Sequence, residues 1–190
     1  VQVAFTGQVM QEQPQQGASE AIGLLAAIII LLIVFGTVIA AVIPILLALL
    51  AVGMGITLLT LAAGFTDFNT ITPILATMIG LGVGIDYSLF IVTRFRQALH
   101  DGVPPRDAAA LAASTAGRAV IFAGTTVAIS VIGLATIGLD FITKMGIGAS
   151  LTVLTSVAVA VTLLPAVLAL LGHRVDRLKI PFIKTPDDSL

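Results

Sequence analysis

The stretch of sequence that decides the fold is residues 80–99, GLGVGIDYSLFIVTRFRQAL. It is apolar for most of its length, carries one acid, Asp86, and ends near two arginines, Arg94 and Arg96. At 1.5 Å per helical residue, Asp86 lies roughly 12 Å from Arg94. Cations suit both the negative end of a helix dipole and an anionic inner leaflet. We therefore expect Arg94 and Arg96 to anchor the cytoplasmic end of a membrane helix that holds Asp86 near mid-membrane.

The composition of the whole chain points to a bilayer as its solvent. Of its 190 residues, 58% are hydrophobic and 10% are charged, whereas a soluble domain has roughly 45–50% apolar and about 25% charged residues. The net charge of −1 gives no attraction to nucleic acid, and the lack of cysteine excludes disulfides and thiolate metal sites. His100 and His173 have no second ligand at metal-binding spacing. We expect neither a metal nor another cofactor.

Five stretches are apolar enough to cross a hydrocarbon core, which takes about 20 helical residues. They are residues 19–38, 39–65, 71–94, 119–138 and 141–171. Between the third and fourth, residues 106–116 are Ala-rich and follow a pair of prolines, so we predict a short helix lying at the membrane interface. The sequence predicts an all-α integral membrane protein, a bundle of five transmembrane helices.

The basic residues predict the orientation of this bundle. Alternating spans put the loop between the third and fourth spans on the same side as the C-terminus. Eight of the nine basic residues fall on that side, and Lys144 alone falls on the other. The positive-inside rule makes the basic side cytoplasmic, so we expect the N-terminus outside and the C-terminus inside.

The ends of the chain are expected to lie outside the membrane. The first residue is Val1 rather than Met, and we expect the chain to be a piece of a longer protein. Residues 1–5, VQVAF, favour a β-strand, so residues 1–18 are interpreted as the end of an extracytoplasmic domain and its linker. Residues 19–172 form the predicted transmembrane domain, and residues 173–190 a cytoplasmic tail.

Asp86 is the residue to which the sequence gives a chemical role. An acid within a span costs at least about 2.5–3.5 kcal/mol on insertion scales, and such residues usually face the bundle interior or a water-filled cavity on an ion pathway. Removal from water favours the neutral carboxyl group, so we expect Asp86 to take up and release a proton. Tyr87 either joins this relay or packs against another helix. The alternative for Asp86, a structural acid bonded between helices, is less favoured because the basic residues of the spans, Arg94 and Lys144, lie at their ends.

Small and hydroxyl residues surround the acid in the sequence. Gly80 and Gly84 form a G-x-x-x-G pair and Gly82 precedes Asp86 by about one turn, so we expect these three glycines to allow close helix packing near the relay. Ser130 is the polar residue of another span that we expect to contribute to the relay. The remaining hydroxyls are expected to bond their own helix carbonyls: Thr125, Thr126, Thr152, Thr155 and Ser156.

Residues 80–99 resemble the fourth transmembrane helix of the MMPL family, within the resistance-nodulation-division superfamily. Two further stretches agree with that family: AGRAVIFAGTTVAISVIGL at 116–134 and TLLPAVLALLGHRVDRL at 162–178. The resemblance covers residues 20–178 and would make this segment the second to sixth helices of one half. The ending LGHRVDRL is more like the N-terminal half. The unit is also similar to the sterol-sensing domain of eukaryotic relatives.

This resemblance implies a transporter core of two six-helix halves, each with an extracytoplasmic porter domain. It implies export of lipids or other hydrophobic molecules across the cell membrane of bacteria, driven by the proton gradient. Asp86 and Tyr87 would form a proton relay with their counterparts in the other half, and Ser130 falls where the family places a relay-contacting serine. The chain lacks the first helix, most of both porter domains and the second half, so the implied partners are the second half, a hydrophobic substrate and membrane lipids.

We interpret the chain as half of the proton-translocating core of such an exporter. A lipid-binding regulatory module like the sterol-sensing domain, without transport, is the alternative; a second half with another Asp-Tyr pair would distinguish the two. An enzyme fits worst, because a hydrolytic site would need a second acid or a nucleophile–base pair within the spans. No P-loop is present, so ATP-driven transport by this segment is not supported.

Overall fold

The computed structural model describes residues 16–176, with side chains described from residue 21 onward. The strand predicted at residues 1–5 and most of the predicted tail at 173–190 lie outside the described residues. Between residues 16 and 176 the chain forms α-helices and short 3₁₀-helices, without a β-strand. The elements are α1 (Gln16–Phe35), α2 (Val38–Ala62), α3 (Ile71–His100), α4 (Pro105–Ile132), η2 (Gly133–Ile137), α5 (Asp140–Leu171) and η3 (Gly172–Asp176).

The elements form an all-α membrane bundle, as the composition predicts. Four helices, α2 to α5, are long and apolar enough to cross a membrane. The remaining expected span, α1, has 20 residues, but its described apolar part is limited to Ala21–Phe35. The fold class expected from the sequence is therefore confirmed, with one helix shorter in its apolar part than the rest.

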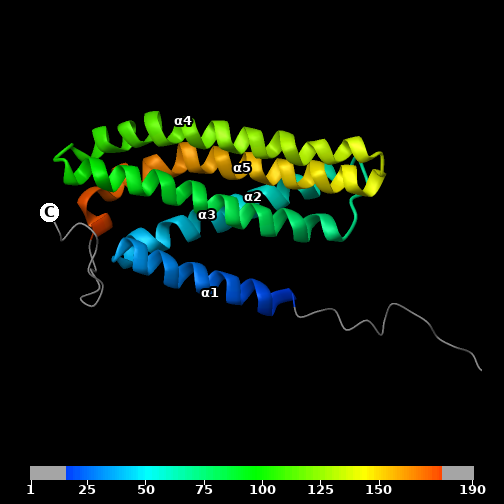
Figure 1. Ribbon diagram of the computed structural model, residues 1–190, viewed down its shortest axis with the longest axis horizontal. Coiled ribbons are helices and arrows are strands. Elements are labelled where there is room, and N and C mark those ends of the chain that lie inside the picture. The colour runs from blue at the N-terminus through cyan, green and yellow to red at the C-terminus, as the bar shows by residue number, and fades with distance from the viewer. Residues whose placement is uncertain (1–15, 177–190) are drawn as a thin grey trace, which may run out of the picture.

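Helix α5 holds the bundle together, because it packs against α2, α3 and α4. Figure 1 shows α3, α4 and α5 running side by side along the long axis, with α1 at one side of the bundle. The α2, α4 and α5 surfaces that meet the core are rich in buried alanines, including Ala48, Ala51, Ala112 and Ala160. Small side chains let helix backbones approach closely, which is how membrane helices gain packing energy without a hydrophobic driving force.

Two glycines of α3 lie where this helix packs closely against its neighbours. A Cβ atom added at Gly84 would lie 3.0 Å from the Cβ atom of Ala48 in α2, and one added at Gly80 would collide with Thr152 of α5. At the same level the Ser156 hydroxyl of α5 donates a hydrogen bond of 3.3 Å to the Gly80 carbonyl oxygen. One face of α3 is therefore pressed against α2 and α5.

The structure differs from the sequence prediction in α4. We expected a separate interfacial helix at residues 106–116 and a span from 119 to 138, but Pro105–Ile132 is one continuous helix and residues 133–137 are a 3₁₀-helix. The reason is local. Alanine has the highest helix propensity. Gly117, the weak helix former at the expected break, is buried, and a Cβ atom added there would lie 3.9 Å from Val161 of α5. Nothing interrupts the backbone hydrogen bonds there.

Two smaller features follow from residue spacing within a helix. Lys144 Nζ lies 2.8 Å from Asp140 Oδ2, four residues earlier in the first turns of α5. The hydroxyl groups of the spans mostly bond carbonyl oxygens four residues before them in their own helix. Four of the residues expected to form such a bond do form it: Thr126, Thr152, Thr155 and Ser156.

We predict that Gly84→Ala lowers the stability of the folded bundle by about 1–3 kcal/mol, because the new methyl group would overpack against the Ala48 backbone, 3.2 Å away. The matched control is Gly53→Ala in α2, where nothing lies within 4 Å of an added Cβ atom. Thermal denaturation of the purified protein in detergent measures both. A Gly84→Ala variant as stable as Gly53→Ala would contradict this packing.

Candidate functional site

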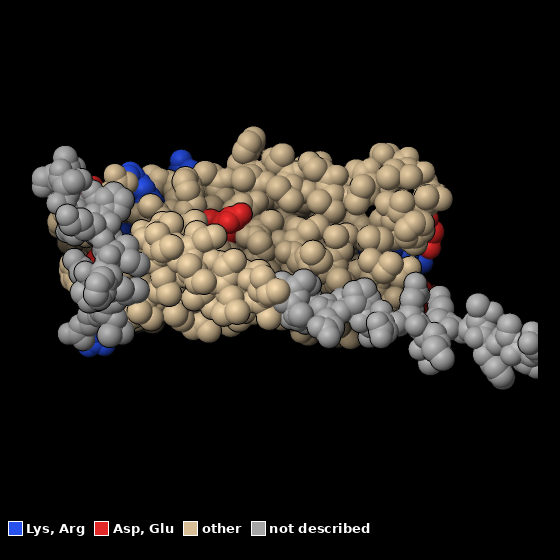
Figure 2. All heavy atoms as spheres, turned by 60° about the horizontal axis from the view of Figure 1, so that its bottom comes forward, with Lys and Arg blue, Asp and Glu red and all other residues tan. Residues whose placement is uncertain are grey.

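Asp86 lies in the middle of α3, as the sixteenth of its 30 residues. Its side chain is exposed, and within the described residues it makes no hydrogen bond or ion pair. In Figure 2 an acidic group interrupts a surface that is otherwise uncharged midway along the bundle. Asp86 is the only acid of α3, whose arginines lie in its last two turns. A lone carboxylate thus sits at mid-height on an apolar face.

The two sides of α3 differ sharply at this level. Gly80 and Gly84 are buried against neighbouring helices, whereas Gly82 has no heavy atom within 4 Å of an added Cβ atom. Gly82 and Asp86 are four residues apart and both are exposed, so they share the open face of the helix. Met78 and Phe90, 61% and 52% exposed, extend that face above and below. The described helices leave this face uncovered.

Tyr87 joins α3 to α4. A Cβ atom added at Gly124 of α4 would lie 3.1 Å from Tyr87 Cε2 and 3.5 Å from its hydroxyl oxygen, and would collide with Val157 of α5. The absence of a side chain at Gly124 is therefore what makes room for the tyrosine ring. Asp86 and Tyr87 are consecutive in α3, so their side chains leave the helix about 100° apart. Tyr87 packs between helices while remaining beside the acid.

Ser130 is not brought into contact with these two residues. It is exposed, and its hydroxyl donates a hydrogen bond of 2.8 Å to the carbonyl oxygen of Thr126 in its own helix. It follows Gly124, the neighbour of Tyr87, by six residues, which is about 9 Å along the helix axis. The described residues contain no hydrogen bond from Ser130 to Asp86 or Tyr87.

A cavity of about 390 Å³ opens between α3 and α4 beyond Asp86. Phe90, one turn after the acid, lines it together with Thr93, Arg94 and Gln97 of α3 and Thr115 of α4. The Arg94 guanidinium donates a hydrogen bond of 2.8 Å to the side-chain oxygen of Gln97. The nearest polar residue of α3 in this lining, Thr93, is seven residues after Asp86, which is about two helical turns.

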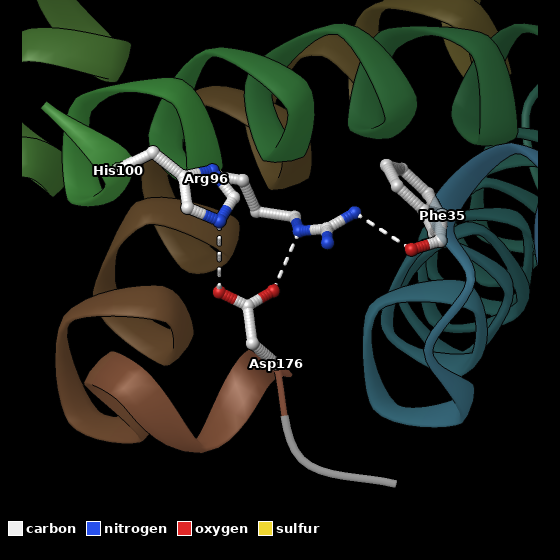
Figure 3. Close-up of polar contacts among 4 residues, drawn as sticks. All are labelled: Phe35, Arg96, His100 and Asp176. Carbon is white, nitrogen blue, oxygen red and sulfur yellow. Dashed lines mark hydrogen bonds and ion pairs between the residues drawn. The ribbon is translucent and has the colours of Figure 1, made fainter. Parts of the chain in front are cut away.

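Arg96 has a different environment from Arg94. Its Nε atom lies 2.7 Å from Asp176 Oδ1, and its Nη1 atom donates a hydrogen bond of 3.0 Å to the carbonyl oxygen of Phe35. Figure 3 shows this guanidinium between the end of α1 and the segment after α5. Arg96 is thus held by protein groups rather than directed only toward lipid headgroups.

The model of the MMPL family matches residues 2–182 of this chain. The chain belongs to the MMPL family. It is 43% identical over 158 residues to "Membrane protein YdfJ" of Bacillus subtilis, an alignment that covers 83% of this chain and 22% of the relative. It is 35% identical over 185 residues to "Trehalose monomycolate exporter MmpL3" of Mycolicibacterium smegmatis, covering 94% and 18%. It is 40% identical over 145 residues to "Mycolic acid-containing lipids exporter MmpL11" of the same species, covering 76% and 15%.

This MMPL chain spans about a fifth of the length of the curated relatives it matches. Those relatives are bacterial and two are named as lipid exporters. Together with the four helices long enough to cross a membrane, the family membership makes the chain part of a multi-pass bacterial membrane protein.

Two residues of this MMPL segment were not singled out in the sequence. Gly124 follows Gly117 by seven residues, a spacing that is common in packed helices. Only its position beside Tyr87 in the structure shows that it makes room for that ring. Asp176 stands in a charged terminal run, and its partner Arg96 is 80 residues away. The predicted topology placed the ends of the third and fifth spans on one side of the membrane, which was the available signal that they could pair.

Gly124→Ala is predicted to lower the stability of the folded bundle by about 1–3 kcal/mol, because the added methyl group would collide with Val157 and crowd the Tyr87 ring. Gly117→Ala is the matched control: it is buried in the same helix, and the nearest neighbour of its added Cβ atom would be Val161 at 3.9 Å. Thermal denaturation of the purified protein in detergent gives the measurement. Equal stability of the two variants would refute this packing role for Gly124.

Proposed function

We propose that the full-length protein exports lipids or other hydrophobic compounds across the cytoplasmic membrane, driven by the proton-motive force. This segment would carry half of the proton relay. The lipid-exporter names of the relatives support the substrate class, and the lone acid in α3 supports the coupling to protons. Asp86 and Tyr87 would be the relay residues of this half.

The observation that carries the proposal is Asp86 itself. A charged carboxylate at this height costs several kcal/mol in a bilayer, and no described cation neutralises it. Protonation removes the charge, so the ease with which α3 packs against an apolar surface depends on whether Asp86 holds a proton. That dependence is the property that a proton-driven transporter requires of a switch residue.

The open face around Asp86 supports the presence of a second half. The described helices leave Asp86 and Gly82 uncovered, and acids within spans almost always face protein or a water-filled cavity rather than lipid. A second six-helix half of the same full-length chain would cover this face. Gly82 would then allow its backbone to approach the acid closely.

The charged ends of the bundle support the orientation. Within the described residues, Arg94, Arg96, Arg106 and Arg174 belong to the end where α3 and α5 finish and α4 begins, while Lys144 pairs with Asp140 at the opposite end. The positive-inside rule makes the arginine end cytoplasmic. The start of α1 is therefore proposed to lie on the outer side.

This orientation gives the proton a path. Ser130 would lie on the outward side of Asp86, on the route by which a proton enters from outside, rather than in direct contact with the acid. The cavity lined by Phe90, Thr93 and Arg94 would lie on the cytoplasmic side and offer the route of release. The relatives' names favour export over the sensing alternative, and they give no support to an enzymatic role.

We predict that Asp86→Asn abolishes export while the protein remains inserted, since asparagine has the shape of the protonated acid but carries no exchangeable charge. The measurement compares lipids outside the cell, by mass spectrometry, in strains lacking the gene or carrying the wild-type or variant gene. Normal export from the Asp86→Asn strain would sink the proposal. Asp140→Asn, which alters the ion pair at the other end of the bundle, should export normally.

Ser130→Ala should slow export only in part, because the residue lies on the proposed entry path about 9 Å from the level of Tyr87. Thr162→Ala is the control, because its hydroxyl also bonds the carbonyl oxygen four residues earlier but lies in α5, away from that path. Proton uptake by proteoliposomes, followed with a pH-sensitive dye, distinguishes them. An entry-path role would be contradicted if Ser130→Ala abolished proton uptake completely, and equally if it left proton uptake unchanged.

A further inference from the structure

Three helix ends meet at the guanidinium group of Arg96 (Figure 3). It forms an ion pair with Asp176 of η3, and it donates a hydrogen bond to the carbonyl oxygen of Phe35 at the end of α1. The guanidinium carbon also lies 5.5 Å from the centroid of the Phe35 ring. His100 Nε2 is 4.0 Å from the other carboxylate oxygen of Asp176. Arg96 thus links α3 to both α1 and the segment after α5.

The Phe35 carbonyl group is an acceptor that the fold leaves available. Phe35 is the last residue of α1, and Gly36, with φ of +63°, turns the chain away before α2. The last carbonyl groups of a helix have no partner within the helix and carry its negative dipole end. The Arg96 side chain is only 12% exposed, and a charged hydrogen bond is strong in such a site.

The bond from Arg96 to Phe35 connects α1 to a second helix, since α1 otherwise packs mainly against α2. The most buried side chains of α1, Leu31 and Phe35, lie in its last two turns. Toward its start Ile22 and Leu25 are 67% and 59% exposed. The bond from Arg96 to Phe35 joins this edge helix directly to the helix that carries Asp86.

The part of α3 between Asp86 and Arg96 is a helix segment that can move as one rigid body. The two residues are ten positions apart in α3, about 15 Å along the axis, and residues 86–96 contain neither glycine nor proline. Kinks in helices arise mainly at such residues. A shift of α3 at Asp86 is therefore carried to Arg96 without a hinge between them.

We propose that Arg96 is a positioning residue that couples proton-dependent movement of α3 to α1. This inference rests on the proposed function, because it needs Asp86 to change its protonation state. When α3 shifts, the guanidinium draws the end of α1 with it, and the tilt of α1 changes at its outer start. A planar guanidinium can hold a carboxylate and a carbonyl group at fixed angles at once, which the single ammonium group of lysine cannot reproduce.

The test uses the full-length protein in lipid nanodiscs with pairs of nitroxide labels and pulsed electron paramagnetic resonance. This chain has no cysteine, so labels enter at introduced cysteines; any elsewhere in the protein are replaced first. Leu170 of α5, 87% exposed, is the reference position. Met78 reports on α3 and Ile22 on α1, both exposed. Each distance is measured in acidic and in alkaline buffer.

In the wild-type background both distances should shift between the two buffers, and in Asp86→Asn neither should shift. In Arg96→Lys the Met78–Leu170 distance should still shift, which also shows that the bundle is folded, while the Ile22–Leu170 shift is lost along with export. Arg106→Lys is the matched control, since that arginine is exposed at the same end of the bundle and belongs to the first turn of α4, outside the link between α3 and α1. It should leave both shifts intact.

Persistence of the Ile22–Leu170 shift in Arg96→Lys would overturn the coupling role, and so would its loss in Arg106→Lys or its absence in the wild type. If Arg96→Lys fails to insert, Asp176→Asn decides, because it removes one of the two groups that hold the guanidinium. A reduced Ile22–Leu170 shift there supports the coupling, and an unchanged shift refutes it. Failure of the proposed function has a separate signature, namely normal export from Asp86→Asn.

Discussion

The structure depends on one constraint, the cost of placing the Asp86 carboxylate at mid-height in an apolar helix. Because that charge cannot rest against lipid cheaply, α3 is divided into two faces. Gly80 and Gly84 press one face against α2 and α5, and the other face holds Asp86 and Gly82 free of the described helices. The same helix is thereby fixed on one side and left uncovered by the described helices on the other.

The features that local sequence determines were predictable. Hydropathy gave the membrane bundle and the spans, because a span is set by an uninterrupted apolar run of sufficient length. Spacing put Gly82 and Asp86 on one face, and the ion pair of Asp140 with Lys144 follows from their separation by four residues in a helix. The position of Asp86 within α3 needed only the location of Arg94 and the rise per residue.

The features that arise between distant segments were not predictable in this way. The sequence predicted a break between a short helix at residues 106–116 and the following span. In the structure α4 is continuous, because the alanines there have high helix propensity. The neighbour of Tyr87 proved to be Gly124, because the register between α3 and α4 is set by packing that a single sequence does not display. Arg96 was assigned only to membrane anchoring, and its partners lie 61 and 80 residues away.

The central claim is that the Asp86 carboxyl group takes up and releases a proton within the bundle. Infrared difference spectroscopy of the full-length protein in lipid, between acidic and alkaline buffer, measures this directly through the carbonyl stretch of a protonated carboxyl group. The account predicts a pH-dependent band in the wild-type protein that is missing from Asp86→Asn and retained in Asp140→Asn. Identical difference spectra for the wild type and Asp86→Asn across the pH range would contradict it.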